Sequence, residues 1–126
     1  MTLIRPTLAA LALLAATAVP AGSAPMASTK AAFDGGWSVL IVTEKGTCDR
    51  AYRYPVKIQN GAVGYAGSAS FTVSGQVGDN GSVTVTVARG NQSAKGTGRM
   101  AGNDGSGTWT AGSGECSGTW TAERRS

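Results

Sequence analysis

Short runs of alternating apolar and polar residues, separated by glycine-bearing turns, fill the chain from residue 37 almost to its C-terminus. The clearest run is residues 82–88, where every second residue is valine and the others are serine, threonine or alanine. A period of two places the apolar side chains on one face of a β-strand, and valine and threonine favour strands. No run outside the N-terminal segment has a helical period. The chain is therefore predicted to be all-β.

The turns recur roughly every eight to twelve residues, which is typical of an antiparallel meander. The expected strands number about eight and cover residues 37–43, 52–59, 62–66, 69–77, 82–88, 93–100, 107–111 and 118–125. A meander of this kind forms a barrel, either closed or partly open. Pro55 favours the partly open form, because proline lacks the N–H that a central strand donates.

Residues 1–21 have the layout of a secretory signal peptide, with Arg5 before an apolar run and small residues after it. Cleavage after Ala21 and cleavage after Ser23 both fit the small-residue rule. The apolar run is shorter than the roughly 20 residues of a spanning helix, so we expect cleavage and not an anchor. The mature protein is then expected to be periplasmic or secreted, with no membrane span.

Beyond the signal peptide, residues 22–32 show no period and are expected to form a flexible tail, and residues 33–126 are expected to form a single β-barrel domain. Cys48 and Cys116 are the only cysteines. An exported chain allows them to persist as a disulfide, and a domain of this size benefits from a covalent link. A disulfide is predicted, with two free thiols as the alternative.

Tyrosine and tryptophan on the inward strand faces stand opposite strands whose inward residues are glycine or alanine. Two interpretations follow. The rings fill the space over the glycines, which we favour because a small barrel is usually dense. Alternatively, a cavity remains that could hold an apolar or aromatic ligand. Its expected lining is Tyr52, Tyr54, Trp109 and Trp120.

On the outward faces, Leu40 and Val42 lie beside Arg53 and Lys57 if the first two strands pair. An apolar stripe bordered by basic groups is a candidate docking surface for another protein. Isolated aliphatic residues are also ordinary on any protein surface. Both interpretations stay open.

The chain contains no histidine, which removes the commonest general base and the commonest metal ligand. Its aspartates sit at predicted turns, and its cysteines are assigned to the disulfide. We therefore expect no enzyme, no catalytic residues, no metal and no cofactor. Loss of Arg5 with the signal peptide leaves ten basic and seven acidic residues, a net charge of +3. This charge is too small to indicate a nucleic-acid partner.

Three motifs resemble a family of small exported proteins of Gram-negative bacteria. They are FDGGWSV at residues 33–39, YRYPV at 52–56 and CSGTWTAER at 116–124, with Cys48 between the first two. The family's members are mostly uncharacterised, and some carry a loose label of haem utilisation or adhesion. The residues themselves give the haem label no support, since histidine is absent.

Gly35 and Trp37 at the start of the first strand, with Arg124 at the end of the last, resemble the signature of lipocalin-like barrels. Avidin-type barrels and small periplasmic metalloprotease inhibitors share it. The resemblance implies that Trp37 closes the barrel floor and that Arg124 lies across it in a cation–π contact.

Three functions are expected from these observations. The preferred one is a non-catalytic exported binding module for a protein or a small apolar ligand, including an inhibitor that inserts residues 24–32. The alternatives are a surface-adhesion or structural protein and a carrier of haem or another small apolar ligand.

Overall fold

A computed structural model describes residues 29–126. The predicted signal peptide and most of the predicted tail lie outside the described residues. The last part of that tail forms a short 3-10 helix, η2 (Thr29–Phe33). Eight strands follow, namely β1 (Gly35–Lys45), β2 (Ala51–Gln59), β3 (Ala62–Tyr65), β4 (Thr72–Val77), β5 (Ser82–Arg89), β6 (Gln92–Ala101), β7 (Asp104–Ala111) and β8 (Ser117–Arg124). The prediction of an all-β meander of about eight strands is confirmed.

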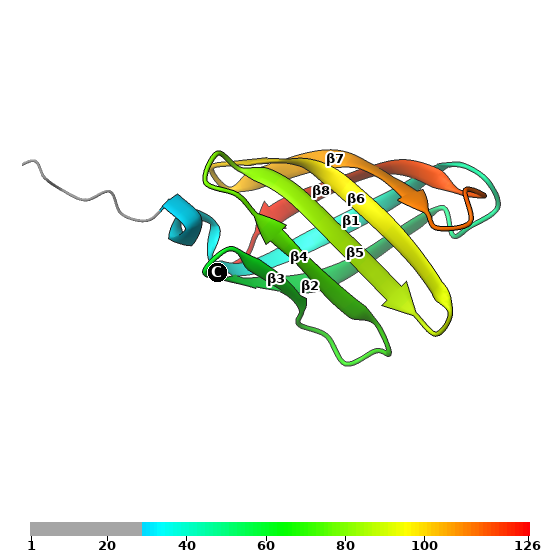
Figure 1. Ribbon diagram of the computed structural model, residues 1–126, viewed down its shortest axis with the longest axis horizontal. Helices are drawn as coiled ribbons and strands as arrows, with labels where there is room; N and C mark the ends of the chain where they lie inside the picture. Colours follow the sequence, from blue (N-terminus) through cyan, green and yellow to red (C-terminus); the bar gives the residue numbers. More distant parts are fainter. Residues whose placement is uncertain (1–28) are drawn as a thin grey trace, which may run out of the picture.

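The strands form one closed barrel in which each pairs antiparallel with the next along the chain. Closure comes from β1 and β8, which pair from Trp37↔Arg124 to Lys45↔Ser117 with an irregularity between Thr43 and Lys45. Figure 1 shows the cyan β1 beside the red β8, so the first and last strands of the domain lie next to each other. The barrel therefore has no free strand edge of the kind that an open sheet exposes.

Pro55 does not open the barrel, contrary to the inference from its place in mid-strand. Its carbonyl accepts a hydrogen bond from the Ala66 N–H at 3.1 Å, so its backbone polar edge faces the side of β3. The β2–β3 ladder extends only as far as the Val56↔Tyr65 pair. The missing N–H of proline therefore falls beside Ala66, just beyond the last pair of this ladder, and not within the ladder.

The connection between β3 and β4 is longer than the alternation predicted. Residues 69–71 were expected to begin the fourth strand, but β4 starts at Thr72. The Phe71 N–H donates to the Ala69 carbonyl at 2.9 Å, which turns the chain sharply just before the strand. Phe71 still points inward, as its half-buried ring contacts other inward aromatic rings.

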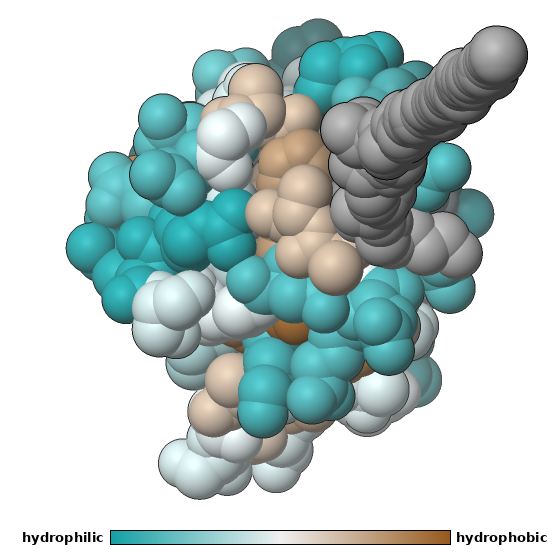
Figure 2. Space-filling view, turned by 90° about the vertical axis from the view of Figure 1, so that its left-hand side faces the viewer, coloured by the Kyte–Doolittle hydropathy of each residue, from teal (hydrophilic) through white to brown (hydrophobic). Residues whose placement is uncertain are grey.

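The two ends of the barrel differ. At one end, here called the floor, are η2, the C-terminus and the β2–β3, β4–β5 and β6–β7 turns. At the other end, here called the mouth, are the loops 46–50, 66–71, 90–91 and 112–116. The floor is on the left in Figure 1, beside η2 and the C-terminus. Figure 2 looks onto the floor, where hydrophobic residues form a narrow central area bordered by hydrophilic ones.

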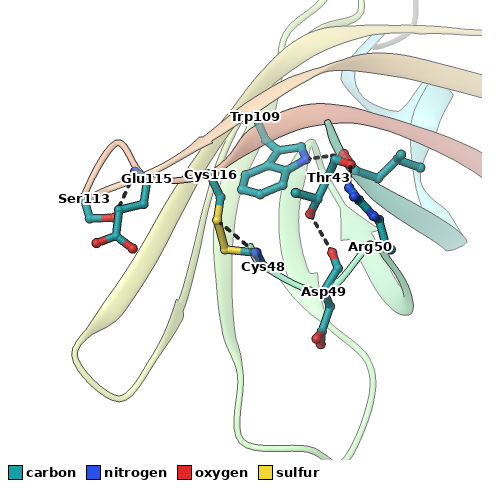
Figure 3. The surroundings of a disulfide bond; sticks show 9 residues. Thr43, Cys48, Asp49, Arg50, Trp109, Ser113, Glu115 and Cys116 are labelled. Carbon is teal, nitrogen blue, oxygen red and sulfur yellow. Dashed lines mark hydrogen bonds between the residues drawn. A yellow bond between two sulfur atoms is a disulfide. The ribbon is translucent and has the colours of Figure 1, made fainter. Parts of the chain in front are cut away.

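The predicted disulfide is confirmed and lies at the mouth. Cys48 in the β1–β2 loop bonds Cys116, which immediately precedes β8 (Figure 3). The Cys48 N–H also donates to the sulfur of Cys116 at 3.2 Å. The Thr43 hydroxyl, in β1, donates to the carbonyl of Asp49 in the loop at 2.6 Å. The disulfide therefore holds the β1–β2 loop against the start of β8, and the hydrogen bond from Thr43 ties the same loop to β1.

Candidate ligand-binding cavity

The barrel interior is not completely filled, which corrects the interpretation favoured from the sequence. It contains a cavity of about 200 Å³ with almost entirely apolar walls. All four predicted lining residues, Tyr52, Tyr54, Trp109 and Trp120, line it. Eight valines from five strands make up much of the remaining wall, together with Ile41, Ile58, Met100 and Ala122.

Dense packing over the glycines nevertheless occurs on one side of the barrel. A Cβ atom at Gly98 would lie 2.6 Å from Cζ2 of Trp120, and one at Gly107 would lie 2.7 Å from its Nε1. The indole ring of Trp120 therefore occupies the space that side chains at these two glycines would need. Both interpretations of the glycines hold in part, because Trp120 fills the β6–β7 side and the cavity occupies the rest.

The exposure of the lining residues places the opening of the cavity at the mouth. Near the floor, Trp37, Ile58, Val77 and Val83 are buried. Toward the mouth, Val87 and Ala94 are only half-buried. Tyr52, at the start of β2, is 39 % exposed although it lines the same cavity. A ligand would enter on this side.

Trp37 and Arg124 close the floor. The Trp37 side chain is 1 % exposed, and its indole N–H donates to the Phe33 carbonyl at 2.9 Å. The Arg124 guanidinium lies over the Trp37 ring, 4.7 Å from its centroid, as cation–π contacts require. The guanidinium also donates to the carbonyls of Asp34 and Ala32 at 2.7 and 2.8 Å. Arg124 thus ties the segment before β1 to the last strand.

Gly35 and Asp34 complete this arrangement. Gly35 has a φ of +134°, a backbone conformation that favours glycine, and a Cβ there would meet the backbone of Ser126. The Asp34 carboxylate accepts hydrogen bonds from the N–H groups of Asn60 and Gly61 at 2.8 and 3.2 Å. It therefore holds the β2–β3 turn against the floor. From the sequence, the aspartates were expected only to lie in turns, so the hydrogen bonds that Asp34 accepts from the β2–β3 turn were not predicted.

Four aromatic rings gather at the mouth. Tyr54 stacks on Phe71 with ring centroids 5.9 Å apart, and Tyr52 and Tyr65 lie 5.5 and 5.6 Å from the same Phe71 ring. The Arg89 guanidinium lies 5.3 Å from the Phe71 centroid. Phe71 and Tyr65 were not among the residues predicted for this site. Their alternation was visible in the sequence, but the ring contacts join residues of two strands, β2 and β3, and of the loop before β4.

The indole N–H groups of the two other tryptophans are satisfied by the backbone. Trp109 donates to the Val42 carbonyl at 3.0 Å, and Trp120 donates to the Thr97 carbonyl at 3.1 Å. Figure 3 shows Trp109 close to the disulfide, with its nitrogen directed away from the sulfur atoms. Both rings therefore offer a ligand apolar surface and no free donor.

The surroundings of the Tyr54 side chain shift its pKa. Burial, and next to it the nearby Tyr52 and Tyr65 hydroxyls, raise the pKa of Tyr54 to about 12. Burial acts because it disfavours the phenolate form. At neutral pH this hydroxyl keeps its proton.

The raised pKa predicts a loss of stability at alkaline pH. Between pH 10 and about 12 the unfolded chain releases the Tyr54 proton while the folded chain retains it. The free energy of unfolding should therefore fall over this window, by about 3 kcal/mol for this group. Urea unfolding of the wild type and of Tyr54→Phe at several pH values tests this. The stability difference between the two proteins should shift against the wild type as the pH rises, and a difference independent of pH would contradict the prediction.

Strands β1 and β2 pair, so the residues of the candidate docking surface lie near one another on the outer barrel wall. Leu40 pairs with Arg53, Val42 pairs with Ala51, and Lys57 pairs with Gly36. Leu40 and Val42 are half-buried, and Arg53 donates to the Ser38 hydroxyl at 3.0 Å. Lys57 is exposed. A docking role for these residues stays a prediction.

Comparison of the chain with models of known protein families, with curated proteins and with solved structures yields no match. Within residues 29–126, no group of three or more histidine, cysteine or acidic side chains could hold a metal ion. In the same part of the chain, no helix is both long enough and apolar enough to cross a membrane. A proposal about function therefore rests on the structure alone.

Proposed function

We propose that the protein is a non-catalytic binding protein that holds a small apolar ligand inside its barrel. The observation that carries this proposal is the apolar cavity of about 200 Å³, closed at the floor by Trp37 and reachable at the mouth beside Tyr52. An apolar cavity of about 150 Å³ binds benzene in another protein, so this cavity suits molecules of about ten non-hydrogen atoms. A porphyrin is several times larger, so haem is not the proposed ligand.

Non-catalytic binding is supported by the chemistry of the walls. The inward side chains are aliphatic or aromatic, and the one charged lining residue, Lys95, is exposed and lies on the outward alternation of β6. The chain has no histidine, and its cysteines are joined. We further propose that the protein acts in the periplasm or outside the cell, where a disulfide persists.

The inhibitor and adhesion functions stay predictions. The segment proposed to insert into a protease, residues 24–32, lies mostly outside the described residues. For adhesion, Leu40 and Val42 are half-buried in the barrel wall, which leaves less apolar surface for a partner than fully exposed side chains would. The cavity, by contrast, has a volume that limits the size of its ligand and an entrance beside Tyr52, so we prefer the binding function.

Titration with toluene tests the proposed function. We expect saturable binding in the millimolar range or tighter, with NMR shifts at the indole N–H signals of Trp109 and Trp120 and at Val87. Ala94→Phe should weaken this binding by at least about tenfold, because the larger side chain enters the cavity near the mouth. Ala101→Phe is the matched control, since Ala101 lies on the same strand and is exposed. Shifts that are unsaturable, or equal in both variants, would contradict the proposal.

A further inference from the structure

Among the described residues that line the cavity, Tyr54 is the buried one that carries a hydroxyl, and no described residue pairs with this hydroxyl. The side chain is 7 % exposed and lines the cavity wall. Across residues 29–126 no hydrogen-bond partner meets its oxygen, whereas each of the three indole N–H groups donates to a backbone carbonyl. Buried polar groups in native proteins are nearly always paired, so an unpaired one at a cavity wall points to a partner supplied by a ligand.

The neighbours of Tyr54 do not supply that partner. The ring stacks on Phe71, which has no polar side-chain atom, and the Tyr65 hydroxyl already accepts the Ala69 N–H at 3.3 Å. Tyr52 lies with its ring centroid 5.6 Å away and is exposed at the mouth. Tyr54 thus lines the cavity with a hydroxyl that none of its described neighbours pairs.

The chemistry of this hydroxyl sets the chemistry of its partner. Burial raises the pKa of Tyr54 to about 12, so at neutral pH the group is a phenol that can donate a hydrogen bond. Among the described residues that line the cavity, Lys95 is the one cation and lies on the outward alternation of β6, and Arg89 at the mouth lies over Phe71 without lining the cavity. The walls therefore offer nothing that would offset the cost of burying a carboxylate. The partner is then an uncharged acceptor, such as a carbonyl oxygen.

We propose that the cavity selects small, uncharged, mainly apolar molecules that carry one hydrogen-bond acceptor, which the Tyr54 hydroxyl binds. An aryl ketone is the representative of this class. The ring occupies the apolar space between the valines and Trp109, and the ketone oxygen accepts from Tyr54. This inference rests on the proposed function, because it concerns the same cavity and adds the class of ligand.

Three probes of nearly the same shape test it by NMR titration of the wild-type protein at neutral pH. Acetophenone has the acceptor, α-methylstyrene replaces the oxygen by a methylene group, and benzoate replaces the methyl group by a second, charged oxygen site. α-Methylstyrene is the more apolar probe and leaves water more readily, so the hydrogen bond is measured by how far the ratio of the acetophenone affinity to the α-methylstyrene affinity falls in Tyr54→Phe. One neutral hydrogen bond predicts a fall of about fivefold. Benzoate should bind more weakly than acetophenone. A ratio that is the same in the wild type and in Tyr54→Phe would overturn the inference while leaving the proposed function in place.

Tyr54→Phe assigns the preference to this residue. The variant keeps the ring and removes only the hydroxyl that lacks a protein partner, so it is expected to fold, and the ratio of the two affinities should fall about fivefold. Tyr65→Phe is the control, because it removes the hydroxyl of a tyrosine in the same ring cluster that does not line the cavity and should leave the ratio unchanged. An equal fall of the ratio in Tyr65→Phe would refute the role of Tyr54.

The carbonyl stretching frequency of bound acetophenone gives a second readout in the wild type, independent of any variant. A hydrogen bond from Tyr54 should lower this frequency from its value in an apolar solvent. A frequency equal to the apolar-solvent value would overturn the inference. Absence of saturable binding for all three probes would instead contradict the proposed function, and the inference with it.

Discussion

Replacing Cys48 and Cys116 together by alanine is expected to lower the free energy of unfolding by about 4 kcal/mol. The disulfide joins residues 68 positions apart, so its loss frees a long loop in the unfolded chain. For a domain of this size, the thermal midpoint should fall by about 20 °C. Circular dichroism during thermal and urea unfolding measures both quantities. The loss is a large share of the net stability of a small domain.

The matched control is Ser113→Ala in the β7–β8 loop close to the bond. It removes the exposed hydrogen bond from the Glu115 N–H at 3.2 Å and should change the stability by less than about 0.5 kcal/mol. Reduction of the wild type should reproduce the loss seen in the double alanine variant. A double variant within about 1 kcal/mol of the wild type would show that the β1–β2 loop is held by its hydrogen bonds and not by the bond between the sulfur atoms.

Trp37→Ala is expected to lower the free energy of unfolding by about 3–5 kcal/mol, the usual loss for a large buried aromatic side chain. Trp37 is 1 % exposed and supports Arg124, so the truncation opens the floor and leaves the guanidinium without its ring. Urea unfolding at neutral pH measures the change. Tyr52→Ala serves as the control, because that ring is 39 % exposed and should lose less.

The contact between Trp37 and Arg124 can be separated from simple truncation by a double-mutant cycle with Arg124→Met. A cation–π contact at this site predicts a coupling energy of about 1 kcal/mol between the two substitutions. The hydrogen bonds from Arg124 to the carbonyls of Asp34 and Ala32 are lost in either background with Arg124→Met, so they cancel in the cycle. Strict additivity would show that Trp37 acts only by filling the floor.

Much of the fold could be predicted because its signals are local. In residues 82–88 the side of each side chain follows from a period of two, and β5 has the predicted face. The loss of residues 69–71 from β4 shows the limit of this signal, since Phe71 keeps its inward direction without belonging to the strand. Alternation tells which way a side chain points and says less about where a ladder ends.

The candidate site was predictable in its members and not in its geometry. Tyr52, Tyr54, Trp109 and Trp120 were expected to line a cavity if one existed, and they line the cavity that the barrel contains. Whether space remained between them depended on how side chains from several strands share the interior. The Trp120 ring lies over Gly98 in β6 and Gly107 in β7. It therefore fills one side of the barrel interior and leaves the rest of the interior open.

By itself, the sequence determined the strand pattern, the inward residues and the pair of cysteines in this protein, because each depends on residue type and spacing along the chain. Only the tertiary structure decided that the barrel closes despite Pro55, that a cavity of about 200 Å³ remains, and that Tyr54 lines it with a hydroxyl that no residue of 29–126 pairs. These three facts depend on distances between residues of different strands. Such distances follow from how the sheet bends and where each ladder stops, which no local pattern specifies.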